Sequence, residues 1–103
     1  MPSYRFTATV GGTRPGTNPA TLLPAIAEAT RTLAVVEDSS LAVIAGAPRI
    51  TIRFTGDSDQ DARRVGTGIL EIAAELAELS RLGLTRRVKQ NWVPVPSESD
   101  PLD

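Results

Sequence analysis

The sequence predicts an α+β fold of the ferredoxin-like class, in which a four-stranded antiparallel sheet carries two helices on one face. Two observations predict it. Segments 3–10 and 49–55 alternate strictly between apolar and polar residues, as half-buried strands do. Segment 57–82 instead places apolar residues four and three positions apart, a spacing that only a helix aligns on one face. The resulting order of strand, helix, strand, strand, helix, strand gives a βαββαβ sandwich through two right-handed crossovers.

The first half of the chain is expected to hold one strand and one helix. The strand at 3–10 turns Tyr4 and Phe6 toward the core and its polar residues outward. Residues 11–19 are expected to form a loop because they are dense in glycine and proline. A helix with one apolar stripe is expected at about 19–34.

The second half is expected to hold a hairpin, the long helix and the last strand. Residues 37–40 are interpreted as a break before a short strand at 41–45, which a tight turn joins to the strand at 49–55. The long helix is expected to end at Gly83, before a last strand at 84–93. Its apolar stripe comprises Val65, Ile69, Ile72, Leu76 and Leu79.

At 103 residues the chain is expected to form one domain over residues 1–93. Residues 94–103 are rich in proline and acidic residues and poor in apolar ones, so a disordered tail is expected there. The N-terminus has no basic-then-apolar leader, and no apolar run approaches the ~20 residues of a membrane span. A cytoplasmic protein without a membrane partner is therefore expected.

The chain contains neither cysteine nor histidine, and this excludes several kinds of chemistry. Disulfides, cysteine- or histidine-bound zinc, and Ser-His or Cys-His nucleophile pairs all need one of these residues. A metal site made of carboxylates alone stays open. We expect no metal site and no cofactor.

The outward side of the predicted sheet gathers positive charge on a chain whose formal net charge is −1. Val88 and Trp92 are expected to face the core, with an interface anchor as the alternative for Trp92. The candidate partner-binding residues are Arg5, Arg49, Arg53, Arg87, Lys89 and Asn91. Arginine and threonine are also common on solvent-exposed strands, so a plain solvated face is the other interpretation.

Nucleic acid is one partner that such a face could bind. RNA-recognition modules of this topology bind single strands on the same face, through exposed aromatic rings that stack on bases. Here Tyr4, Phe6 and Phe54 are expected to point inward, and the overall charge balance is acidic. The sequence therefore favours a protein partner over nucleic acid.

The loop GGTRPGTNP precedes a helix, where backbone N–H groups and the helix dipole favour anions. Gly12, Arg14 and Gly16 are the candidate anion-binding residues. The segment resembles the phosphate loop of acylphosphatases, which have a glycine-containing loop with an arginine after the first strand and an asparagine on a neighbouring strand. Arg14 matches that arginine. The segment LAVIA lacks the asparagine, and the loop lacks the family's glutamine-glycine-valine pattern, which puts acylphosphatase activity in doubt.

Gly66 and Gly68 lie inside the predicted long helix, where each costs roughly 1 kcal/mol relative to alanine. They are interpreted either as points of close approach or as local weakness that the packing tolerates.

Together these observations favour a small non-enzymatic interaction module that docks a protein partner or self-associates, for example as a homodimer. One alternative is a cofactor-independent enzyme of the dimeric α+β barrel type, which shares the strand order but needs apolar and acid–base residues on the outer face. The other alternative is the nucleic-acid-binding module.

Overall fold

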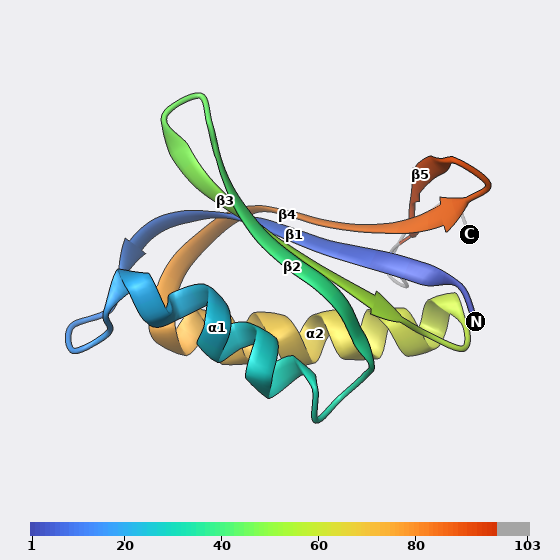
Figure 1. The fold of residues 1–103 in the computed structure, drawn as a ribbon, viewed down its shortest axis with the longest axis horizontal. Helices are drawn as coiled ribbons and strands as arrows, with labels where there is room; N and C mark the ends of the chain where they lie inside the picture. The colour runs from blue at the N-terminus through green and yellow to red at the C-terminus, as the bar shows by residue number, and fades with distance from the viewer. Residues whose placement is uncertain (97–103) are drawn as a thin grey trace.

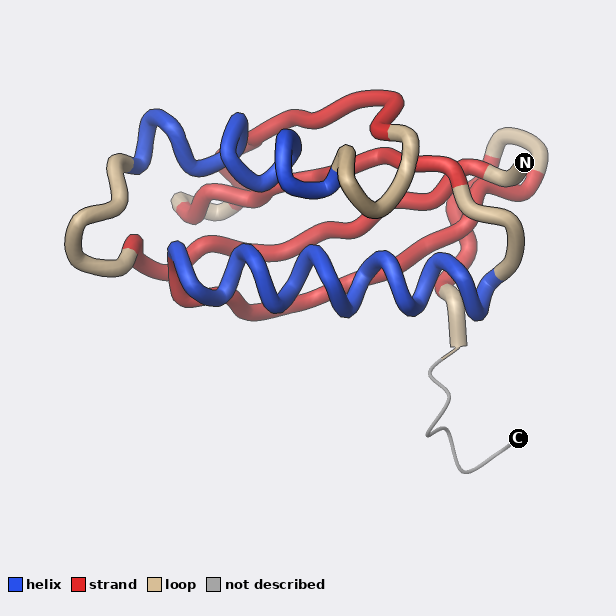
Figure 2. The backbone as a smooth tube through the Cα atoms, turned by 90° about the horizontal axis from the view of Figure 1, so that it is seen from below, coloured by secondary structure: helices blue, strands red, loops and turns tan. Residues whose placement is uncertain are grey.

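The computed structural model describes residues 1–96 as one antiparallel sheet of five strands with two helices on one of its faces (Figures 1 and 2). The strands lie in the order β2-β3-β1-β4-β5. The α+β class with an antiparallel sheet and two helices is confirmed, whereas the predicted number of four strands is wrong. The elements are β1 (Ser3–Thr13), α1 (Pro19–Thr30), β2 (Val36–Ile44), β3 (Ala47–Thr55), α2 (Asp59–Leu76), β4 (Ala77–Val88) and β5 (Asn91–Pro94).

The core lies between the sheet and the helices, and β1 and β3 supply its centre. Alternate residues of both strands are buried, as their patterning predicts. The rings of Tyr4 and Phe54 stack with centroids 5.8 Å apart, and Ile50 and Ile52 are fully buried beside them. Because every second residue of β1 and β3 faces this core, the residues between them lie on the face away from the helices.

Helix α2 begins at a well-formed cap and ends earlier than its sequence pattern predicts. The side chain of Ser58 accepts a hydrogen bond from the N–H of Asp61, at 3.1 Å. The chain leaves the helix at Ala77, which is extended, and enters β4 without a loop. The prediction of helix up to residue 82 is wrong because β1 continues to Thr13 and pairs with residues from Ala77 onward.

The buried side of α2 differs in part from the predicted apolar stripe. Val65 and Ile69 are fully buried, but Ile72 and Leu76 are only half-buried. Alanines occupy the other central positions, and Ala73 is completely shielded from solvent. The small side chains let the helix lie close to the sheet, which is how a chain with few aromatic residues closes its core.

Helix α1 ends at Thr30, before the predicted end near residue 34. Leu33 and Ala34, in the turn that follows the helix, pack against the core. An added Cβ on Gly68 would lie 2.7 Å from Leu33 Cδ1, whereas one on Gly66 would make ordinary contact with Leu84 at 3.7 Å. Gly68 is therefore a point of close approach, and Gly66 is not.

Strands β2 and β3 form a hairpin whose turn bends away from both helices (Figure 1). Ala45 and Gly46 both have positive φ, 52° and 80°, which is the type I′ turn that suits the twist of paired strands. The predicted break at 37–40 is wrong, because these residues lie inside β2, where Asp38, Ser39 and Ser40 pair with β3 and Glu37 lies at an irregularity of the register. At the far end of β2, Leu41 and Val43 face the helix side and are exposed because no helix covers this part of the hairpin, and Ile44 is exposed on the opposite side of the sheet.

The sequence pattern does not predict β5 as a separate element. A two-residue turn with Lys89 at φ 58° reverses the chain, and β5 pairs with the end of β4. Beyond it, the N–H of Val95 donates to the carbonyl of Leu84 at 2.9 Å. The predicted domain boundary at residue 93 thus falls inside β5, and of the predicted disordered tail residues 97–103 lie outside the described residues.

Candidate functional site

The outer face is defined here as the side of the sheet away from both helices. Arg5 of β1 pairs directly with Arg53 of β3, and Thr9 pairs with Arg49, so these residues share that face. The predicted gathering of Arg5, Arg49 and Arg53 is therefore present. Like charges directly opposite each other on a sheet are destabilising unless something compensates them.

Trp92 provides the first compensation. The guanidinium carbon of Arg5 lies 3.9 Å from the centroid of the Trp92 ring, and that of Arg53 lies 5.5 Å from it. A cation over an indole ring is attracted by the ring's quadrupole. The expectation that Trp92 plugs the core is wrong: β5 brings the ring to the outer face, where it is half-buried against arginines.

Glu37 provides the second compensation. Its Oε1 accepts a hydrogen bond from the Ser3 hydroxyl at 2.6 Å and lies 3.5 Å from Nε of Arg53. The Arg53 Nε is buried, yet within residues 1–96 it makes no hydrogen bond of good geometry. The ion pair therefore offsets charge without satisfying every donor of Arg53.

Arg49 is held by hydroxyl groups. Its Nη2 donates to Thr7 Oγ1 at 3.0 Å and its Nη1 to Thr9 Oγ1 at 3.3 Å. Both threonines lie on β1, next to the strand that carries Arg49. The outward threonines, which look like plain solvated residues in the sequence, thus orient a guanidinium.

The other predicted partner-binding residues are placed less favourably. Arg87 pairs with Trp92 across β4 and β5, and its Nε donates to the carbonyl of Lys89 at 3.0 Å. Lys89 lies in the turn between these strands. Asn91 alternates with Trp92 and pairs with Val88, so it lies on the opposite side from the arginine cluster. Val88, expected in the core, is 38% exposed.

The predicted anion-binding loop is divided between two elements. Gly12 lies in β1, and Gly16, with φ 86°, forms the turn that the N–H of Thr17 closes on the Arg14 carbonyl. The Arg14 N–H donates to the carbonyl of Leu76 at 2.8 Å, and its Nε donates to that of Ala74 at 3.2 Å. These are the last carbonyls of α2, so Arg14 caps a helix C-terminus, and anion binding would require it to leave these contacts.

A polar cluster on the helix-facing side joins β1, β4 and α2. Asp59 Oδ1 accepts a hydrogen bond from the Tyr4 hydroxyl at 2.8 Å and one from Arg86 Nη1 at 3.3 Å. Burial, followed by the hydrogen bond to Asp59, raises the pKa of Tyr4 to about 12. At neutral pH the phenol is a hydrogen-bond donor, which suits a structural tie.

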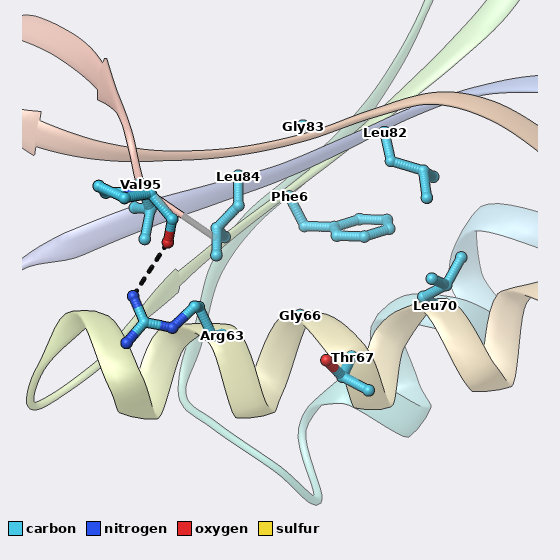
Figure 3. A pocket seen from close by; sticks show the side chains of 10 residues that line it. Phe6, Arg63, Gly66, Thr67, Leu70, Leu82, Gly83, Leu84 and Val95 are labelled. Atoms are coloured by element: carbon cyan, nitrogen blue, oxygen red, sulfur yellow. Dashed lines mark hydrogen bonds between the residues drawn. The ribbon is translucent and has the colours of Figure 1, made fainter. Parts of the chain in front are cut away.

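A second feature of the helix-facing side is an apolar groove between α2 and β4, about 350 Å³ in volume. Figure 3 shows Phe6 and Leu84 lying between the sheet and the helix, above Gly66. Arg63 Nη1 donates to the carbonyl of Pro96 at 3.1 Å and closes one end. The groove offers apolar contact and few polar groups, so we assign it no chemistry.

Within residues 1–96 no group of three or more histidine, cysteine or acidic residues is placed to hold a metal ion. Neither of the two described helices is long and apolar enough to cross a bilayer.

Comparison with known proteins identifies no family. No family model matches the sequence, and no curated protein matches it. Among solved structures, Rv0793 from Mycobacterium tuberculosis is similar, with 18% identity and a TM-score of 0.44 over 96% of this chain and 100% of that one. A likeness of this extent carries no argument about function.

Proposed function

We propose that this chain is a non-enzymatic interaction module that docks an acidic protein partner on the outer face of its sheet. The observation that carries the proposal is the cluster of Arg5, Arg53 and Trp92 on a face that neither helix covers. Arginine and tryptophan are enriched at the energetically dominant positions of protein interfaces. Their mutual stacking fixes both side chains before a partner arrives, which reduces the conformational entropy lost on binding.

The charge of the outer face supports an acidic partner. The face carries Arg5, Arg49, Arg53 and Arg87 against the carboxylates of Glu37 and Asp38. Because the chain as a whole has a formal net charge of −1, this positive charge is local and not a general property of the molecule. A complementary acidic surface would be steered to this face, with an association rate that falls as salt rises.

The test is an anisotropy titration of a fluorescein-labelled oligoglutamate peptide at low and at physiological salt. Arg5→Gln plus Arg53→Gln should weaken binding at least about 10-fold, since each charge-assisted contact contributes roughly 1.5 kcal/mol or more. The matched control is Arg31→Gln plus Arg64→Gln, which removes the same charge from two exposed arginines, one at the C-terminal cap of α1 and one on α2. Equal weakening in both double variants would overturn the outer face as the site.

The same titration with a labelled oligothymidine of matched charge tests nucleic acid as the alternative partner. Trp92 lies on the outer face, which removes the argument that this face has no aromatic ring. We expect weaker binding of the oligonucleotide, because one ring already stacked with Arg5 is a poor platform for successive bases. Tighter binding of oligothymidine than of oligoglutamate would replace the protein partner by single-stranded nucleic acid.

Self-association through β2 is a second candidate function. This strand is at the edge of the sheet, and Leu41, Val43 and Ile44 are 47%, 69% and 55% exposed on it. An exposed apolar edge strand is a template for pairing with another strand, here that of a second copy. Sedimentation velocity should then show a dimer that Val43→Lys converts to monomer, and a wild-type monomer at high concentration would exclude it.

We infer that the βαββαβ part of the chain belongs to the ferredoxin-like class. Its strand order β2-β3-β1-β4 and the position of both helices on one face agree with that topology, and β5 is an addition to it. The outer face argues against the dimeric α+β barrel enzyme. It holds arginines and threonines where a catalytic cavity would need apolar and acid–base residues.

A further inference from the structure

We infer that a hollow beside the β2–β3 turn is an oxyanion-binding subsite, which takes the carboxylate or phosphate group of a ligand docked on the outer face. The inference rests on the proposed function for the source of that group. The hollow has a volume of about 290 Å³. It is lined by Thr9, Ile44, Ala45, Ala47, Arg49 and Arg81.

Arg49 offers donors that are already oriented. A guanidinium has five N–H groups, and the bonds to Thr7 and Thr9 use two of them, which leaves three for a ligand. The planar fork of N–H groups matches two oxygens of a carboxylate or phosphate. Since two hydroxyls fix the plane of the guanidinium, little side-chain entropy is lost when an anion binds.

The position of Thr7 depends in turn on Gly83. These two residues are partners across β1 and β4, and a Cβ built on Gly83 would lie 2.7 Å from Thr7 Oγ1. Only glycine leaves the hydroxyl where it accepts from Arg49. Gly83, which the sequence suggests as a helix stop, therefore supports the subsite through Thr7.

Arg81 reaches the hollow because of an irregularity in β4. Between the pairs Thr7–Gly83 and Thr9–Ser80, β4 takes three residue steps where β1 takes two, which is a β-bulge. Arg81 lies in it with φ 52°, a conformation that residues other than glycine rarely adopt. Bulges of this kind re-aim side chains, and here the result is a second arginine at the hollow.

The charge of the hollow is not neutralised within the described residues. In residues 1–96 neither Arg49 nor Arg81 forms an ion pair, in contrast to Arg53, which has Glu37. Two cations lining one hollow repel each other, and an anion between them removes that repulsion and gains charge-assisted hydrogen bonds. The apolar residues Ile44, Ala45 and Ala47 line the hollow beside the arginines and limit the access of water to a bound anion. Less water around the anion strengthens its attraction to the two guanidinium groups.

The test is a ¹H–¹⁵N NMR titration with inorganic phosphate alone, followed by one with the oligoglutamate peptide. We expect phosphate to shift the Nε–H signals of Arg49 and Arg81 and the amides of Ala45 and Ala47. Arg49→Gln and Arg81→Gln should each weaken phosphate binding at least about 10-fold, whereas Arg64→Gln, on α2 and outside the hollow, should leave it unchanged.

A second variant separates positioning from charge. Gly83→Ala should weaken phosphate binding although both arginines remain, because the new methyl group displaces the Thr7 hydroxyl and releases Arg49. Spectra with native dispersion for each variant exclude unfolding as the cause. Phosphate shifts that persist in Arg49→Gln and Arg81→Gln would overturn the subsite.

The two titrations also separate this inference from the proposed function. If the arginine variants lose phosphate and weaken the peptide equally, a partner carboxylate is the source of the oxyanion. If they lose phosphate but bind the peptide normally, the hollow takes a free phosphate group and the docking face stands without it. Peptide binding that fails in the wild type, with phosphate still bound in the hollow, would overturn the proposed function and leave the subsite.

Discussion

Tyr4 acts at the scale of single residues as a tie between the sheet and the start of α2. Its hydroxyl donates to Asp59, and its pKa rises from 10.0 to about 12. Because the folded-state pKa is the higher one, the protonated phenol contributes stability that is fully present below pH 10 and is lost as the pH rises toward 12.

Tyr4 is the only tyrosine, so tyrosinate absorbance reports it alone. We expect a titration midpoint near 12 in the native protein and near 10 in concentrated urea. Asp59→Asn should lower the native midpoint, since it removes a charge that opposes ionisation. A native midpoint near 10, with the circular dichroism spectrum intact, would contradict the buried hydrogen bond.

The two glycines inside α2 should respond differently to substitution by alanine. Gly66→Ala should raise the free energy of unfolding by about 0.5–1 kcal/mol, because its Cβ meets Leu84 at an ordinary distance and glycine is unfavourable inside a helix. Gly68→Ala should raise the free energy of unfolding by less than this or should lower it, because Leu33 must move to make room for the new methyl group. Urea titrations measure both, and an equal gain would contradict the close approach at Gly68.

At the scale of elements, the strands with strict alternation could be predicted and the boundary between α2 and β4 could not. Residues 77–82 continue the helical spacing, and their propensity agrees with it. Pairing with the end of β1 decides otherwise, and that is a long-range contact which no local pattern contains. The sequence does not reveal the strand at 37–40 for the same reason: these polar residues are part of β2 because the strand pairs with β3.

The β2–β3 turn gives a prediction at this scale. Ala45 adopts φ 52°, where alanine is strained and asparagine is favoured in a type I′ turn. Ala45→Asn should raise the free energy of unfolding by roughly 0.5–1 kcal/mol, and Gly46→Ala should lower it. Thermal and urea unfolding would reveal both effects, and a stabilised Gly46→Ala would refute this turn geometry.

At the scale of the whole molecule, the sequence predicts which strand faces share the outer surface but not how β5 completes it. Arg5, Arg49 and Arg53 follow from alternation alone. Trp92 was misplaced because the reversal at Lys89 carries no glycine or proline signal, so residues 84–93 look like one strand. Arg81 was missed because a bulge, invisible in the sequence, directs it to the hollow.

The central claim is that the outer face is the docking surface, and chemical-shift mapping with the oligoglutamate peptide tests it most directly. The single tryptophan makes the Trp92 indole N–H a unique reporter. We predict that this signal, the Nε–H signals of Arg5 and Arg53, and the amides of β1, β3 and β5 shift together as the peptide is added. Shifts confined to α1 and α2, with the Trp92 indole unchanged at saturation, would contradict the claim.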